Sequence, residues 1–129
     1  MRTIRLTAAA EADIIEILEH SEREFGPAAR ERYDRLMRSA LRDLAESPTR
    51  PGSAARRELG DDIRSWHLRL SRERAKVDGL AVRRPRHLLL YALIGDDVVG
   101  ILRVLHDAME LHRHIDPAIT FPPSDCRPQ

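Results

Sequence analysis

Two apolar runs joined by a short turn constrain the fold of this chain more than any other feature. The first run extends from Arg86 to Ile94, the second from Val98 to His106, and Gly95-Asp96-Asp97 lies between them. Glycine and aspartate accept the positive φ that tight hairpin turns require. Because almost every position is apolar, we expect one face to be fully buried and the other partly covered. The sequence therefore predicts a β-hairpin at the centre of an antiparallel sheet.

The N-terminal third of the chain carries two helical patterns in succession. Thr7 is a suitable cap for a first helix, in which Ile14, Leu18 and Phe25 lie close to one face and acidic residues occupy much of the rest. Gly26-Pro27 is typical of one helix ending and the next beginning. So short a link predicts an antiparallel helical hairpin.

The second helix has the clearer apolar stripe and ends before Ser47-Pro48, because a residue preceding proline leaves the α region. Neither helix can bury its stripe alone, so we expect the later sheet to supply the partner surface. The stripe comprises Tyr33, Leu36, Met37, Ala40, Leu41 and Leu44.

The remaining segments complete an α+β fold. Thr3 to Leu6 is predicted as a first or edge strand, and Ile63 to Leu70 as a strand before the hairpin. Ser71 to Pro85 is polar and basic, which indicates an extended loop with a strand-like Leu80 to Val82. The predicted architecture is an N-terminal helical hairpin packed on an antiparallel or mixed sheet of about four strands.

The C-terminal end is predicted to leave the compact domain. Asp107 is expected to cap a short helix through about Ile115. Residues 116–129 contain four prolines and are expected to form a mobile tail. We therefore expect one domain over residues 1–115, in keeping with the total length of 129 residues.

Composition narrows the class of protein. The only cysteine is Cys126, which excludes a disulfide within one chain and favours a reducing cytoplasm. No apolar run is long enough to cross a bilayer, and the first residues lack the apolar core of a secretory signal. The net charge is only +1, but residues 50–86 hold 11 basic side chains against 5 acidic ones. A basic block of this kind fits either a solvated loop or a surface for an anionic partner.

Several segments, taken in order, resemble the RelE/ParE superfamily of bacterial toxins from type II toxin–antitoxin modules. The most specific is the last, an Arg-Val-Leu-His ending followed by Met and an acid, which is typical of the ParE-like side. The similar segments are Thr7 to Ile17, Phe25 to Ala29 with Tyr33 and Leu36, Leu44 to Gly52, Arg64, and Ile101 to Glu110. The stretch from Ser71 to Pro85 is longer than the hairpin link of many members.

The resemblance implies one of two activities. RelE-like toxins cut mRNA in the ribosome, whereas ParE-like toxins inhibit DNA gyrase without nuclease chemistry of their own. In both branches an antitoxin with a charged, partly helical tail wraps the toxin, which implies a hetero-oligomer. A third alternative is a toxin fold that has lost toxicity and serves only as a binding module.

Five residues are candidates for RNA cleavage, which needs an acid, a base and cations at the phosphate. They are Arg64, His67, His87, Arg103 and His106. Three of them also have a structural alternative: the two arginines could pair with acids across the sheet, and His106 could belong to a strand-to-helix corner. Arg103 and His106 are expected to point to opposite faces of a regular strand.

The segment Met109 to His114 lacks the tyrosine that many RelE-like toxins carry there. We interpret Tyr33 and Tyr91 as packing residues, because one lies on the helical stripe and the other within a strand. These observations favour the ParE-like branch, and with it a gyrase inhibitor rather than an enzyme.

Partner contacts are expected on the basic block and on the less covered face of the sheet. The candidates are Arg69, Arg72, Arg74, Lys76, Arg83 and Arg84 for an anionic partner, and Leu89 and Tyr91 for a groove that receives the antitoxin. The six histidines lack close carboxylate or cysteine spacing, so neither a metal nor a cofactor is expected.

Overall fold

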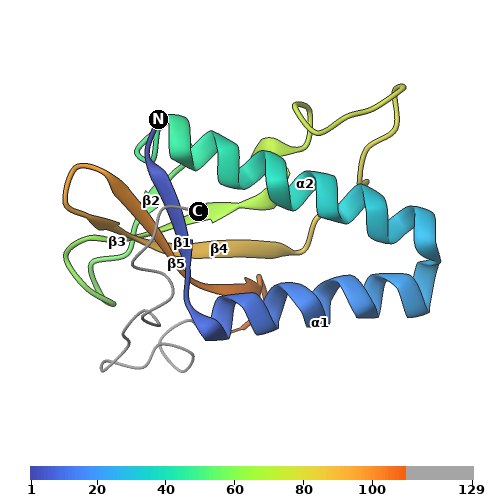
Figure 1. The fold of residues 1–129 in the computed structure, drawn as a ribbon, viewed down its shortest axis with the longest axis horizontal. Coiled ribbons are helices and arrows are strands. Elements are labelled where there is room, and N and C mark those ends of the chain that lie inside the picture. Colours follow the sequence, from blue (N-terminus) through green and yellow to red (C-terminus); the bar gives the residue numbers. More distant parts are fainter. Residues whose placement is uncertain (110–129) are drawn as a thin grey trace.

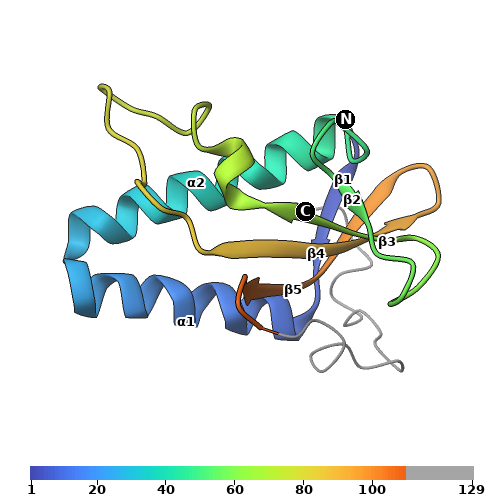
Figure 2. The ribbon, with the colours of Figure 1, turned by 180° about the vertical axis from the view of Figure 1, so that it is seen from behind.

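Two helices cover one face of a five-stranded sheet (Figures 1 and 2). The structure is a computed structural model and describes residues 1–109. The elements in order are β1 (Thr3–Leu6), α1 (Ala8–Phe25), α2 (Pro27–Glu46), β2 (Ala54–Ala55), β3 (Ile63–His67), a 3₁₀ turn η1 (Leu68–Ser71), β4 (His87–Ile94) and β5 (Val98–His106). This arrangement confirms the predicted α+β fold with an N-terminal helical hairpin on a sheet.

The sheet has the strand order β1-β5-β4-β3-β2 and is mixed. Strand β1 runs parallel to β5, and the other neighbouring strands are antiparallel. The predicted central hairpin is confirmed as β4 and β5, with Gly95 at a φ of 59° in its turn. The fifth strand, beyond the four expected, is β2, which has only two residues.

The helix boundaries follow the local sequence closely. The Thr7 hydroxyl accepts a hydrogen bond from the Ala10 N–H at 3.0 Å, and Pro27 is the first residue of α2. Gly26 has a φ of 92°, a conformation that suits glycine, and it alone separates the two helices. The expectation that Phe25 packs on the helical face is wrong, because its side chain is 74% exposed. Figure 1 shows the reason: the helix joint extends past the ends of the strands.

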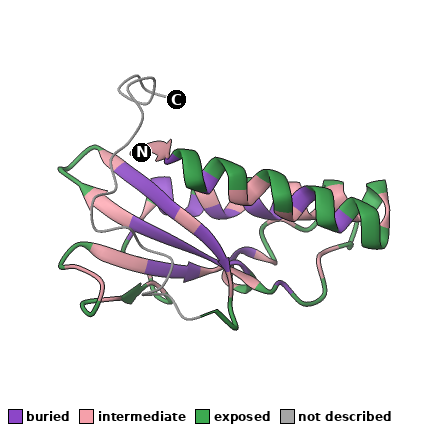
Figure 3. Cartoon of the chain, turned by 90° about the horizontal axis from the view of Figure 1, so that it is seen from below, coloured by how far each residue is buried: buried purple, intermediate pink, exposed green. Residues whose placement is uncertain are grey.

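The core lies between the helical hairpin and the sheet. Leu36, Met37 and Leu44 of α2 are buried against Trp66, Leu89 and Tyr91 of β3 and β4 and against Val99, Ile101 and Val104 of β5. The intervening residues Leu88, Leu90, Leu102 and Leu105 are buried as well (Figure 3). Both sets of alternate positions in the hairpin are thus apolar and buried, as its sequence predicts.

A β-bulge in β5 decides which side chains face the helices. Leu90 is paired with Arg103 and Tyr91 with Ile101, so Leu102 is an additional residue in the ladder. Without this bulge, strict alternation after Ile101 would turn Arg103 and Leu105 toward the helices. With it, Val104 joins Val99 and Ile101 in the core, and His106 shares the orientation of Val104.

Three details of the sequence prediction need correction. The strand from Ile63 ends at His67, not Leu70, because the His67 side chain accepts the Arg69 N–H at 3.1 Å and starts the η1 turn. Leu80 to Val82 is not a strand; an isolated bridge between Val77 and Leu80 is the only β-pairing there. The predicted helix beyond Met109, the domain end at 115 and the tail over 116–129 lie outside the described residues.

Candidate functional site

Two histidines and a tyrosine meet where β4 begins and β5 ends. His87 and His106 are cross-strand partners, and their rings lie edge-to-face with centroids 5.5 Å apart. Tyr33 reaches them from α2, with its hydroxyl 2.6 Å from Nδ1 of His87. Because the Arg86 N–H donates to the Tyr33 oxygen at 3.3 Å, the tyrosine proton is free to be donated to His87. Tyr33 therefore has a polar role at this corner as well as the packing role predicted for it.

The surroundings keep this pair uncharged at neutral pH. Burial, reinforced by the neighbouring His106, lowers the pKa of His87 to about 4. Burial likewise raises the pKa of Tyr33 to about 12, against a smaller opposing effect of the Arg86 N–H. A neutral imidazole that accepts a hydrogen bond at Nδ1 carries its own proton on Nε2. At pH 7 His87 is thus a neutral hydrogen-bonding group rather than a cation for phosphate.

A carboxylate ties the third histidine to the same corner. Asp107 lies 3.0 Å from Nε2 of His67, 3.4 Å from the Arg86 guanidinium and 3.5 Å from Nδ1 of His106. The hydrogen bond from His67, helped by Arg86, holds the pKa of Asp107 below its usual value. The structure therefore brings His67, His87 and His106, three of the five nuclease candidates, to one end of the sheet.

The fourth candidate, Arg103, is bound to α1. Its guanidinium donates to both carboxylate oxygens of Asp13 at 2.7 and 2.9 Å, and Asp13 also accepts the Val104 N–H at 3.0 Å. Within residues 1–109 no strand pairs with this edge of β5 beyond Leu6, and Asp13 accepts the Val104 N–H there instead. The bidentate ion pair raises the pKa of Arg103 further. Arg103 thus forms a structural ion pair, which was the alternative to a role in RNA cleavage.

A pocket of about 280 Å³ lies between α1 and the end of β5. Arg103 and His106 both line it, together with His20, His87 and Asp13. Arg103 and His106 were expected to point to opposite faces of the strand, and both nevertheless line this pocket. Arg103 is bonded to Asp13 of α1, and both side chains line the pocket.

The fifth candidate, Arg64, lies elsewhere. Its Nε donates to the Ser53 hydroxyl at 2.7 Å and its Nη2 to the Ser53 carbonyl at 3.1 Å. The same hydroxyl contacts the Tyr91 hydroxyl, which in turn donates to the Pro48 carbonyl at 2.5 Å. Arg64 therefore holds the segment after α2 against the sheet, and it does not line the pocket.

Leu89 and Tyr91 are core residues, which corrects their assignment to an antitoxin groove. Both are fully buried and pack in the cluster beneath the helices. Leu89 and Tyr91 do lie on one face of the strand as expected, but that face is the one covered by the helices. Neither side chain can contact a partner while the helical hairpin covers the sheet.

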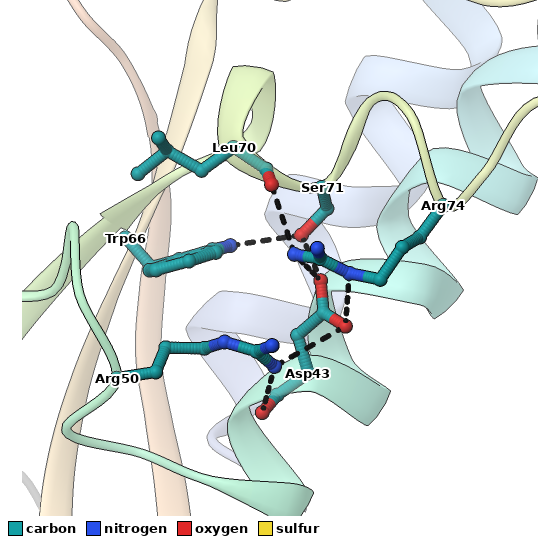
Figure 4. A network of polar contacts seen from close by, with 6 residues as sticks. All are labelled: Asp43, Arg50, Trp66, Leu70, Ser71 and Arg74. Atoms are coloured by element: carbon teal, nitrogen blue, oxygen red, sulfur yellow. Dashed lines mark hydrogen bonds and ion pairs between the residues drawn. The ribbon is translucent and has the colours of Figure 1, made fainter.

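A buried carboxylate on α2 anchors the start of the basic loop (Figure 4). Asp43 is 3% exposed and accepts hydrogen bonds from the Ser71 hydroxyl at 2.6 Å and from Arg74 at two positions, each 2.8 Å. Arg50 lies 3.4 Å from the same carboxylate, and Trp66 donates its indole N–H to Ser71 at 2.9 Å. Arg74, one of the predicted partner-binding residues, is thus engaged in fixing the loop to α2.

The other basic residues of the loop differ in their availability. Arg72 donates to the Val82 carbonyl at 2.5 Å, which holds the loop to itself, and Lys76 pairs with Glu73 at 2.8 Å. Arg69, Arg83 and Arg84 are exposed, and within residues 1–109 their side chains have neither an ion pair nor a hydrogen bond.

A second concavity follows the basic side of α2. We call it the basic groove: it has a volume of about 450 Å³ and lies between α2 and residues 74–77. Its cations are Arg35, Arg38, Arg42, Arg74 and Lys76. The sequence had placed a basic surface in the loop alone, and it had not joined the loop to the arginines of α2.

Comparison with known proteins decides the family. Residues 4–111 match the family described as ParE toxin of type II toxin-antitoxin system, parDE. The chain belongs to the ParE toxin family. Among solved structures, it resembles one titled chromosomal ParDE TA system from P. aeruginosa, with 17% sequence identity and a TM-score of 0.59. That match covers 82% of this chain and 96% of the other, and it supports the fold. No curated protein matches the sequence significantly.

Membership confirms the resemblance seen in the sequence and its ParE-like side. This ParE-family toxin belongs to a toxin–antitoxin system, which implies an antitoxin as its partner. Among residues 1–109, neither helix combines the length and apolar character needed to cross a membrane. The same residues hold no group of three or more His, Cys, Asp or Glu side chains arranged to bind a metal ion.

Proposed function

We propose that this ParE-family toxin inhibits DNA gyrase in the cytoplasm and that its cognate antitoxin neutralises it in a hetero-oligomeric complex. The family match over residues 4–111 supports the ParE-like branch. The observation that carries the choice against a nuclease is the state of its candidate cations. Arg103 is held bidentately by Asp13, and Arg64 is held by Ser53.

The state of the histidines also argues against a nuclease. Cleavage through a 2′-hydroxyl needs a base, an acid and cations directed at one phosphate. His87 is neutral, already accepts the Tyr33 hydroxyl, and is partly buried. The pocket beside it contains Asp13 and Glu16, so carboxylates line the place where a phosphate would have to bind.

A supercoiling assay with purified gyrase and relaxed plasmid tests the proposal. The toxin in excess is expected to abolish supercoiling, and detergent with protease is expected to release linear plasmid if gyrase stalls after cleavage. Addition of the antitoxin should restore supercoiling. Undisturbed supercoiling at saturating toxin would overturn the proposal; harmless expression without antitoxin would then favour a binding module of the same fold.

A ribosome-dependent endoribonuclease is the second candidate, and one observation favours it. Asp107 lies 3.0 Å from His67 and 3.5 Å from His106, and His106 lines an open pocket. Primer extension on an mRNA under translation would reveal codon-linked cuts, which His106→Gln should abolish. The absence of cuts from the wild-type protein would exclude this activity.

A further inference from the structure

We propose that the basic groove binds the phosphate backbone of duplex DNA. Arg35, Arg38 and Arg42 follow one another at spacings of three and four residues, which places them on one side of α2. At 1.5 Å per residue they extend over roughly 10 Å along a straight, rigid support. Arg74 and Lys76 line the facing side.

Arg35 is the groove cation whose own protein contacts are least complete. Its Nε is buried, yet it has no hydrogen-bond partner within the described part of the chain. Buried guanidinium donors in native proteins are normally paired, and an unpaired one calls for an explanation. The planar guanidinium fork of an arginine suits phosphate geometry.

The charge balance of the groove favours an anion mainly through Arg35 and Arg42, because Arg38 is paired with Asp34, Arg74 with Asp43 and Lys76 with Glu73. Asp43, one of its two carboxylates, is buried and already neutralised by Arg50 and Arg74. Glu46 is the other and is exposed. Arg42 is exposed and has no ion pair within residues 1–109.

The lining also distinguishes between polyanions. No aromatic side chain lines this groove in the described structure, so it offers no platform on which unpaired bases could stack. Contacts limited to arginine and lysine suit a regular backbone read without sequence preference. The choice of DNA over RNA rests on the proposed function, because gyrase holds duplex DNA while it passes one segment through another.

The test is fluorescence anisotropy with the full-length toxin and a labelled 30-base-pair duplex in low and high salt. With about four cations engaged, affinity is expected to fall roughly 100-fold between 50 and 200 mM salt. The double variant Arg35→Gln with Arg42→Gln should bind more weakly at low salt, and its affinity should fall only about 10-fold over the same range.

The matched control is Arg23→Gln with Arg57→Gln, which removes the same charge from exposed positions outside the groove. It should reproduce the wild-type affinity and salt slope, and thermal melting should confirm that both variants fold. No binding at 50 mM salt, or equal losses in the two double variants, would overturn the proposal. So would a tenfold preference for duplex RNA or for polyglutamate, since either would identify a different partner.

These outcomes are separable from those of the gyrase assay. Inhibition of supercoiling by a toxin that does not bind duplex DNA would remove the groove proposal and leave the proposed function intact. DNA binding by a toxin that leaves supercoiling undisturbed would do the reverse.

Discussion

The two helices form one hairpin on one sheet, but their charges are opposite. Helix α1 carries six acidic side chains and Arg23 as its only Lys or Arg, whereas α2 carries five arginines and the basic loop lies beside it. Each helix nevertheless directs one aspartate toward the sheet, where its carboxylate accepts hydrogen bonds from other elements. Asp13 of α1 accepts Arg103 and the Val104 N–H from β5, and Asp43 of α2 accepts Ser71 and Arg74.

The difference between the two carboxylates lies in burial and in what each one holds. The Asp43 side chain is 4% exposed and fixes the η1 turn and the start of the loop to α2. The Asp13 side chain is 15% exposed and closes the edge of β5 that β1 leaves unpaired. Inward carboxylates therefore define the fold, and outward charges remain available for partners. The following predictions test this division.

The largest effect is expected from Asp43→Ala. The substitution removes the shared partner of Arg50, Ser71 and Arg74, and it leaves two guanidinium groups facing a vacated pocket. Breaking a buried ion pair typically costs 3–5 kcal/mol, and because Arg74 can turn to water we expect about 3 kcal/mol. Urea unfolding measures this loss. The control Asp34→Ala removes an exposed helix pair with Arg38 and should cost less than about 1 kcal/mol.

Asp13→Ala should come second, with a loss of about 2 kcal/mol in the free energy of unfolding. It leaves the Val104 N–H without its acceptor and releases Arg103, whose side chain is 24% exposed and can be hydrated in part. Glu16→Ala, one turn further along α1 at an exposed position, is the control and should change stability by less than about 0.5 kcal/mol. A loss from Asp13→Ala equal to that from Asp43→Ala would mean that burial does not distinguish the two anchors.

These two anchors also mark the limit of what the sequence predicts. Local signals were sufficient for the helix ends at Thr7, Gly26 and Ser47 and for the β4–β5 hairpin, because their causes lie within a few residues. Asp13 belongs to a run of acids on α1 that the sequence could only describe as an outer surface. Its partner Arg103 is 90 positions away, and no periodicity indicates which acid in the run will meet it.

The candidate site was predicted in part for the same reason. His67, His87 and His106 were identified because histidines on neighbouring strands were expected near the sheet centre; the strand register brings them together, but at one end of the sheet. The bulge at Leu102 could not be predicted. The run around it is apolar at both odd and even positions, so the sequence pattern is the same with or without an additional residue. Leu89 and Tyr91 were assigned to the wrong face for a related reason: when both faces of a hairpin are apolar, the pattern does not reveal which one the helices cover.

The contact between His87 and Tyr33 predicts a change of stability with pH that is smaller than the effects of the two aspartate substitutions. Unfolded histidine binds a proton below about pH 6.5, whereas folded His87 binds one only near its lowered pKa of about 4. The unfolded state therefore binds more protons between these values, and stability should fall as the pH falls through this window. Solvent screening of a half-buried ring reduces the expected loss to about 1–2 kcal/mol.

His87→Gln should remove most of this dependence, because the amide oxygen can still accept the Tyr33 hydroxyl without titrating. Urea unfolding at pH 7 and pH 4.5 provides the measurement. His20→Gln, on the exposed side of α1, is the matched control and should keep the wild-type slope. A slope unchanged by His87→Gln would place the titration elsewhere in the fold.

The smallest losses of stability are expected from substitutions on the outer faces of the two helices. These substitutions test directly whether outward charges contribute to folding. Arg38→Ala on α2 and Glu19→Ala on α1 each break a solvent-exposed pair at a spacing of four residues. Such pairs contribute only a few tenths of a kcal/mol, since water and salt screen them. Both variants should therefore unfold within about 0.5 kcal/mol of the wild-type protein. A loss above about 1 kcal/mol in either would show that outward charges also hold the hairpin together, and the basic side of α2 could then not be treated as a surface kept for a partner.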